Sequence, residues 1–258
     1  MLELGVLTLG WLEALLLPLT RLTAFFLAAP LFPQVISNVR VRIVYALVLC
    51  ILVLPFVPDL NAPATTSFPQ PNLILVINEA LIGVSMGLIL QFVLAAVVVA
   101  GEQISLSLGI GFAQSFDPTI GSTPVLSQFF NVLALLIFLT TGGHVLVVGM
   151  LVESLRELPP GSFSVLDLEQ LIQFSSIVFT GAALLAAPLL LALLAVNVGV
   201  GALSRATPSL NVFAVGFAIA LLVGFALLFV LLPAMSERIV DLWEQAESYL
   251  ARRLLGFG

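Results

Sequence analysis

Long uncharged stretches are the feature that most constrains this 258-residue chain. Residues 80–101, 118–152, 170–204 and 206–236 form runs of 22, 35, 35 and 31 residues without an Asp, Glu, Lys or Arg. About 20 predominantly apolar residues are enough to cross a bilayer as a helix. Each of the four runs can therefore supply a membrane-spanning helix.

The overall composition agrees with this reading. Hydrophobic side chains make up 61% of the chain and charged side chains 9%, whereas soluble domains have about 45–50% and about 25%. Hydropathy and Gly/Pro breaks predict six apolar segments, at residues 4–29, 42–58, 73–100, 125–152, 171–200 and 211–233. We expect an all-α integral membrane protein of about six long apolar helices, without a separate water-soluble domain.

The pattern becomes amphipathic after Pro233. Ile239, Leu242, Trp243 and Ala246 recur at helical spacing, opposite an acidic face of Glu237, Asp241, Glu244 and Glu247. An acidic face is attracted only weakly to anionic lipid, so this pattern favours a C-terminal helix over 236–258 that docks on protein. A loosely ordered tail is the alternative.

The charged and metal-binding residues exclude several functions. Eight Arg, no Lys and fourteen acids give a net charge of −6, which offers no cationic surface to a phosphate backbone and argues against nucleic-acid binding. One Cys cannot form a cysteine metal cage. The single His argues against a His-based nucleophilic triad. We expect no enzyme activity, no metal and no cofactor.

Small residues four apart lie on two of the predicted helices. Gly83 and Gly87 share one helix face, as do Gly216, Ala220 and Gly224. Such faces let a neighbouring helix approach closely. The neighbour can belong to this chain or to another subunit, and the pattern does not distinguish the two.

Three of the charged residues within or beside apolar segments are candidates for a buried role: Arg21, Glu79 and Glu102. A charge at the centre of a spanning helix costs about 2.5–3.5 kcal/mol on insertion scales. Arg21 and Glu79 can pair, reach the membrane interface or serve a function. Glu102 differs, because it directly precedes an irregular segment.

That segment, residues 106–124, combines apolar residues with loop formers. Irregular backbone this apolar is tolerated at membrane depth only when it is buried in protein or lines a cavity. Phe112 and Phe116 are its bulky residues. The segment is therefore either an ordinary turn packed against the helices or a re-entrant plug that seals a pore by hydrophobic contact.

The chain contains an ordered set of short motifs: Ala100-Gly101-Glu102, Gly109-x-Gly111-Phe112-Ala113 leading into Asp117-Pro118, Gly143-His144, Leu158-Pro159, and Ser204-Arg205-x-x-Pro208. This set resembles the FliR family, the flagellar members of the type III export-gate proteins. Each motif is short, but their order and the hydropathy profile extend the likeness over nearly the whole chain.

The resemblance implies a non-enzymatic subunit of the FliP–FliQ–FliR export gate, in the bacterial inner membrane and the flagellar basal body. Its partners would be FliP, FliQ, FlhB, membrane lipid and exported unfolded flagellar proteins. Residues 1–170 would be a FliP-like part, 171–235 a FliQ-like helical hairpin and 236–258 the amphipathic helix.

The resemblance also assigns roles to individual residues. The plug loop maps onto residues 106–124, with Phe112 at the family's aromatic position and Leu108, Ile110 and Phe116 beside it. A seal must also open, and glycines on either side of the phenylalanines are hinge candidates because of their conformational freedom: Gly101, Gly109, Gly111 and Gly121. Structural or gating polar residues are Glu102, Asp117 and Arg205.

Two further readings stay open. A virulence injectisome subunit of the same family would share fold and mechanism. A small-molecule transporter should show paired broken helices and acidic residues near mid-membrane, and residues 118–152 and 170–236 contain no acid.

Overall fold

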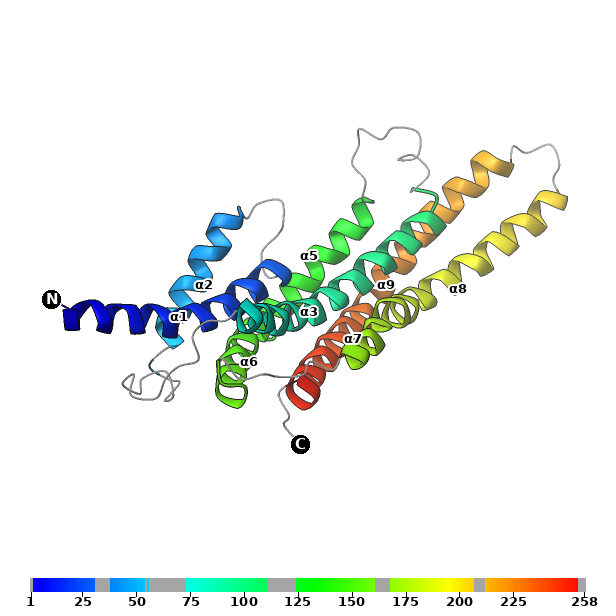
Figure 1. The fold of residues 1–258 in the computed structure, drawn as a ribbon. Coiled ribbons are helices and arrows are strands. Elements are labelled where there is room, and N and C mark those ends of the chain that lie inside the picture. Colours follow the sequence, from blue (N-terminus) through cyan, green and yellow to red (C-terminus); the bar gives the residue numbers. More distant parts are fainter. Residues whose placement is uncertain are drawn as a thin grey trace. The chain divides into compact units, whose positions relative to one another are not determined.

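The computed structural model describes residues 2–30, 38–53, 55, 73–110, 124–160, 168–206 and 212–254. All regular secondary structure within these ranges is helical, as Figure 1 shows. The helices are α1 (Leu2–Ala28), α2 (Val39–Val53), α3 (Leu73–Ser107), α5 (Val125–Thr140), α6 (Gly143–Glu157), α7 (Leu168–Ser175), α8 (Ile177–Ala206) and α9 (Val212–Tyr249), and a π-helical turn, η4 (Leu250–Leu254), follows. The expected all-α fold is confirmed.

The expected count of six long helices is not confirmed. Three helical stretches in the described residues are long and apolar enough to cross a membrane: α3, residues 169–202 of α7 and α8, and residues 216–252 of α9 and η4. A fourth span is possible if α5 and α6 are counted as one broken helix. Helix α2 has 15 residues and is therefore about 22 Å long, shorter than the roughly 30 Å hydrocarbon core.

The break between α5 and α6 lies at Thr141 and Gly142. Gly142 has φ 79° and ψ 12°, a left-handed conformation that glycine adopts without steric cost. The Thr141 amide still donates to the Ile137 carbonyl at 2.9 Å, so the helical hydrogen-bond pattern of α5 continues up to Thr141. One apolar run in the sequence is thus divided into two helices by a single backbone conformation.

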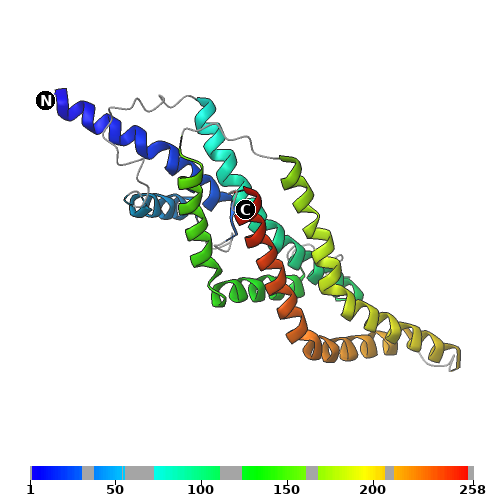
Figure 2. The ribbon, with the colours of Figure 1, turned by 90° about the horizontal axis from the view of Figure 1, so that it is seen from below.

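The chain forms two compact units. Unit 1 contains α1, α2, the first half of α3, α6, α7 and the C-terminal end of α9; unit 2 contains the second half of α3, α5, α8 and most of α9. In unit 1, α1 and α2 pack on each other (Figures 1 and 2). The ring of Phe26 on α1 lies edge-on to Phe25 and to Tyr45 of α2, with centroids 5.2 and 5.0 Å apart.

The core of unit 2 is built around α5. Phe130, Ala134 and Phe138 recur every four residues and are at most 1% exposed, so they form one buried face of the helix. Trp243 of α9 packs on this face, with its ring centroid 4.6 Å from that of Phe138.

Helix α9 continues without interruption through Pro233 to Tyr249. The amphipathic segment expected after Pro233 is therefore the last part of a longer helix. Its apolar residues are buried within this chain, namely Ile239, Leu242, Trp243, Ala246 and Leu250, whereas Glu237, Asp241 and Glu244 are exposed.

Candidate functional site

The start of the 106–124 segment is anchored at the end of α3. The amides of Leu108 and Gly109 each donate to a carbonyl of the preceding turn, Ile104 and Leu106, at 3.0 Å. Gly109 has φ 77°, the left-handed conformation that commonly ends a helix. The chain therefore leaves α3 at Gly109, one of the glycines predicted to act as a hinge.

Much of the expected plug lies outside the described residues. This applies to Gly111, Phe112, Phe116, Asp117 and Gly121. Of the other residues assigned to the plug, Leu108 is 1% exposed and Ile110 is half-buried. Leu108 lies against Gly224 of α9, because a Cβ added to Gly224 would meet the Leu108 side chain.

Leu108 is thus part of the packed base from which the segment departs. The close approach depends on the absence of a side chain at Gly224. Gly216 plays a similar part with α8, since a Cβ there would lie 2.9 Å from Val200 Cγ1. Ala220, between them on the same face, is 7% exposed. In unit 2 this small-residue face of α9 therefore contacts helices of the same chain.

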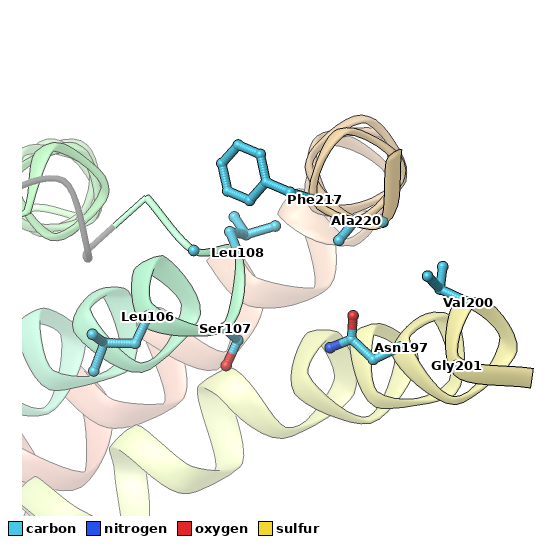
Figure 3. A pocket seen from close by; sticks show the side chains of 10 residues that line it. Leu106, Ser107, Leu108, Asn197, Val200, Gly201, Phe217 and Ala220 are labelled. Atoms are coloured by element: carbon cyan, nitrogen blue, oxygen red, sulfur yellow. The ribbon is translucent and has the colours of Figure 1, made fainter. Parts of the chain in front are cut away.

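An apolar pocket of about 530 Å³ opens beside this base. Its walls come from the end of α3, from α8 and from α9, and comprise Leu106, Ser107, Leu108, Gly109, Asn197, Val200, Gly201, Gly216, Phe217 and Ala220. Figure 3 shows Phe217 and Leu108 close together and the Asn197 side chain pointing from α8 toward them. A Cβ on Gly109 would lie 2.7 Å from the Phe217 ring, so a side chain at this position would have to displace the ring.

Sequence reasoning did not identify Asn197 or Phe217. One signal was available: Asn197 is the only Asn or Gln between Gln173 and Asn211, and a lone amide in an apolar helix is expected to face protein or a cavity. Phe217 carried no comparable signal, because it is one of 19 phenylalanines.

Gly101 lies inside α3 rather than at its end. A Cβ there would lie 2.7 Å from Cα of Ser127 on α5, so this glycine brings α3 and α5 into backbone contact. The hydroxyls of Ser105 and Ser127 are buried without a hydrogen-bond partner among the described residues. The two helices that flank the segment are therefore joined by a tight contact near its base.

The polar residues expected at the gate lie in different surroundings. Glu102 is half-buried on α3, and Arg205 is exposed in the last turn of α8, where a cation interacts favourably with the helix dipole. No group of three potential metal ligands occurs in the part of the chain that the structure describes.

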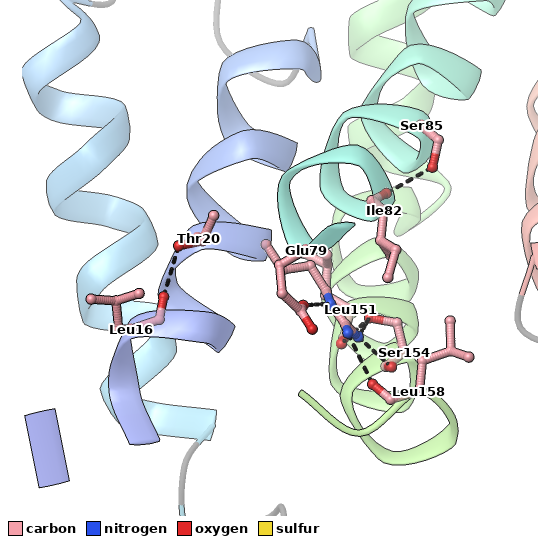
Figure 4. A network of polar contacts seen from close by, with 9 residues as sticks. Leu16, Thr20, Glu79, Ile82, Ser85, Leu151, Ser154 and Leu158 are labelled. Atoms are coloured by element: carbon pink, nitrogen blue, oxygen red, sulfur yellow. Dashed lines mark hydrogen bonds and ion pairs between the residues drawn. The ribbon is translucent and has the colours of Figure 1, made fainter. Parts of the chain in front are cut away.

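In unit 1, Arg21 and Glu79 form an ion pair. Nε of Arg21 donates to Oε2 of Glu79 at 2.6 Å, and both side chains are 0% exposed. The guanidinium also donates to the carbonyl oxygens of Ser154 and Leu158 at the end of α6, as Figure 4 shows. Of the outcomes that the sequence left open for these residues, pairing is the one observed.

Gly83 and Gly87 lie next to this pair. A Cβ on Gly83 would meet the carbonyl oxygen of Arg21, and one on Gly87 would lie 2.7 Å from Cβ of Ala28. This small-residue face of α3 therefore packs against α1 of the same chain.

Comparison with known proteins gives a consistent result. The sequence profile described as bacterial export proteins, family 1, matches residues 12–246. The chain is similar to the flagellar biosynthetic protein FliR of Pectobacterium carotovorum, with 35% identity over 94% of this chain and 93% of that protein. It is also similar to FliR of Escherichia coli K12 (33% identity over 94% and 93%) and of Aquifex aeolicus (32% over 93% and 95%).

Proposed function

The chain belongs to family 1 of the bacterial export proteins, and on this premise we propose that it is a core subunit of the flagellar protein export gate. The observation that carries the proposal is the match over residues 12–246, together with relatives named FliR that align over more than nine tenths of both chains. The subunit helps to form and seal the channel through which flagellar proteins leave the cell.

The location follows from the same premise. The protein is a multi-pass protein of the bacterial inner membrane and belongs to the flagellar basal body. The three candidate spans support a membrane location. We assign it no enzyme activity and no cofactor, since its role is to build a channel.

The proposed partners are FliP, FliQ and FlhB, and unfolded flagellar proteins are the cargo. Of the most apolar 18 residues in the candidate span 216–252, only 17% are buried within the chain. The corresponding share for the candidate span 169–202 is 39%. Apolar surface of this extent needs lipid or further subunits to cover it. The proposed organisation is a FliP-like part over 1–170, a FliQ-like hairpin over 171–235 and the amphipathic helix over 236–258.

The proposed seal is the plug loop at 106–124, with Phe112 and Phe116 as its bulky residues. An apolar constriction blocks ions because they do not shed their hydration shell to enter it. The packed base at Leu108 and the left-handed turn at Gly109 support this role, because a seal needs a fixed point from which it moves. Gly111 and Gly121 are the proposed hinges within the loop.

The test begins with deletion of the gene and complementation. Cells without the chain should be unable to swim, and the chain purified in mild detergent should bring FliP- and FliQ-like proteins with it. Normal swimming with a loss of host-directed secretion would instead assign it to an injectisome. Recovery of a monomer that transports a small molecule would overturn the proposal.

The seal has its own test. Cells carrying Phe112→Ala and Phe116→Ala together should leak ions while still assembling the gate. Phe112→Leu with Phe116→Leu is the matched control, because leucine keeps an apolar side chain at both positions and should keep the seal. Unchanged conductance in the double variant would remove the plug assignment.

A further inference from the structure

The buried guanidinium of Arg21 is held by two other helices at once. Nε pairs with Glu79 of α3 at 2.6 Å, and Nη2 donates to the carbonyl of Leu158 at 2.9 Å. Nη1 donates to the carbonyl of Ser154 and lies 3.4 Å from its hydroxyl. Leu158 is the C-cap of α6, where a carbonyl lacks a partner within the helix; the Ser154 carbonyl, one turn earlier, also accepts from the Leu158 amide at 3.1 Å. The cation thus serves as counter-ion for α3 and as cap for α6.

The contact between α1 and α3 is made by backbone and small side chains. A Cβ on Gly83 would meet the carbonyl oxygen of Arg21 and lie 3.0 Å from Cβ of Ala24. A Cβ on Gly87 would lie 2.7 Å from Cβ of Ala28 and 2.9 Å from the carbonyl oxygen of Phe25. These glycines are one helical turn apart, and so are the two carbonyls that they face. If α1 moved by one turn so that Leu17 took the place of Arg21, each glycine would again face a carbonyl oxygen, with Thr20 and Ala24 where Ala24 and Ala28 now lie. Backbone and small side chains would therefore meet the glycines in that register as well.

The ion pair does distinguish the registers. Arg21 is the only basic residue of α1, and a one-turn movement would place Leu17 or Phe25 near Glu79. Glu79 would then be buried without its cation, and the Leu158 carbonyl would lose the guanidinium that caps it. A buried charge without a partner is far more costly than the same charge in a pair.

We propose that the Arg21–Glu79 pair sets the register in which α1 docks on α3 and α6. The glycines permit close approach, and the charges select one position among several that the backbone would accept. The role resembles that of a single polar residue in a coiled coil, which fixes alignment at a cost in stability. The inference is independent of the export function.

The experiment measures register directly. Nitroxide labels are attached at Leu27→Cys on α1 and Leu81→Cys on α3, positions that are 44% and 48% exposed, in the full-length chain in detergent. The native Cys50 is 2% exposed, and the chain without added cysteines controls for its labelling. Pulsed electron paramagnetic resonance then gives the distance distribution between the labels.

With Arg21 and Glu79 intact, we expect one narrow distance. The double variant Arg21→Met/Glu79→Met should remain folded, because apolar residues of similar size often replace a buried pair without loss. It should show a second distance, displaced by up to about 5.4 Å, one helical turn. Arg21→Lys keeps the charge and should retain the single distance.

Two results would overturn the proposal. A double variant with the unchanged single distance would show that packing alone sets the register. A double variant that does not fold would show that the pair provides stability rather than selection. A Val44→Met/Val48→Met control, at exposed positions of α2, should leave the distribution unchanged.

Discussion

The indole N–H of Trp243 donates a hydrogen bond to the main-chain carbonyl of Ala134 at 3.2 Å. Trp243 is 3% exposed and Ala134 is 0% exposed, and the two lie 109 residues apart in the chain. This contact joins the late part of α9 to the middle of α5 within unit 2. It gives the amphipathic end of α9 a defined place on the chain itself.

Removing the indole should therefore destabilise unit 2 in two steps. Trp243→Phe loses the hydrogen bond and should cost about 1 kcal/mol of unfolding free energy. Trp243→Ala also leaves a cavity beside Phe138 and should cost about 3–5 kcal/mol. Denaturant titration in detergent, followed by circular dichroism, measures both. No loss of unfolding free energy in Trp243→Phe would contradict the contribution of the hydrogen bond, and equal costs for the two variants would contradict that of the cavity.

Alanine should have opposite effects at two helical glycines of unit 1. Gly149 on α6 faces open space, where a Cβ meets nothing within 4 Å. Gly149→Ala should stabilise the chain by up to about 1 kcal/mol, because alanine is the better helix former. Gly83→Ala should destabilise it by about 1–3 kcal/mol, because the new methyl group overlaps the Arg21 carbonyl. Midpoint temperatures of the two variants, compared with the parent chain, test the difference in sign.

Gly109→Ala should destabilise the base of the 106–124 segment for two separable reasons. The residue has φ 77°, which costs alanine about 1–2 kcal/mol, and its Cβ would lie 2.7 Å from the Phe217 ring. Phe217→Ala should have a small effect alone, because Phe217 is 51% exposed. Adding it to Gly109→Ala should recover only the steric part. A double-mutant cycle on unfolding free energy measures the recovery, and complete recovery would contradict the backbone contribution.

Cys50, the only cysteine, should resist alkylation in the folded chain. Its side chain is buried on α2 and 2% exposed, so a maleimide should react fully only after denaturation. Val48→Cys, at a position 54% exposed on the same helix, is the matched control and should react without denaturant. Mass spectrometry counts the adducts, and equal rates at both positions would contradict the burial.

The family and the fold class were predictable because both depend on features written along the chain. The export-protein family expected from short ordered motifs is confirmed by the match over residues 12–246, and the all-α membrane fold by the helices. Helix lengths were less predictable. The apolar segment predicted at 73–100 is part of a helix that continues to Ser107. Gly101 does not end this helix; it lies inside it and packs on Ser127.

The candidate site was predictable in position and only partly in composition. A glycine-rich break after the third apolar segment pointed to Leu108 and Gly109, and the chain does leave α3 there. The pocket beside it also needs Asn197 and Phe217 from α8 and α9. No local pattern links residues about 90 and 110 positions further along the chain to that break.

Hydrophobicity and the spacing of charges, proline and glycine thus determined by themselves that this chain forms apolar helices for a membrane. They also marked the small-residue faces, because helical periodicity is a property of local sequence. Only the tertiary structure decided what each face and each charge meets. Arg21 and Glu79 are 58 residues apart, and a charge buried among apolar helices can be tolerated once folding brings its counter-ion to within hydrogen-bonding distance.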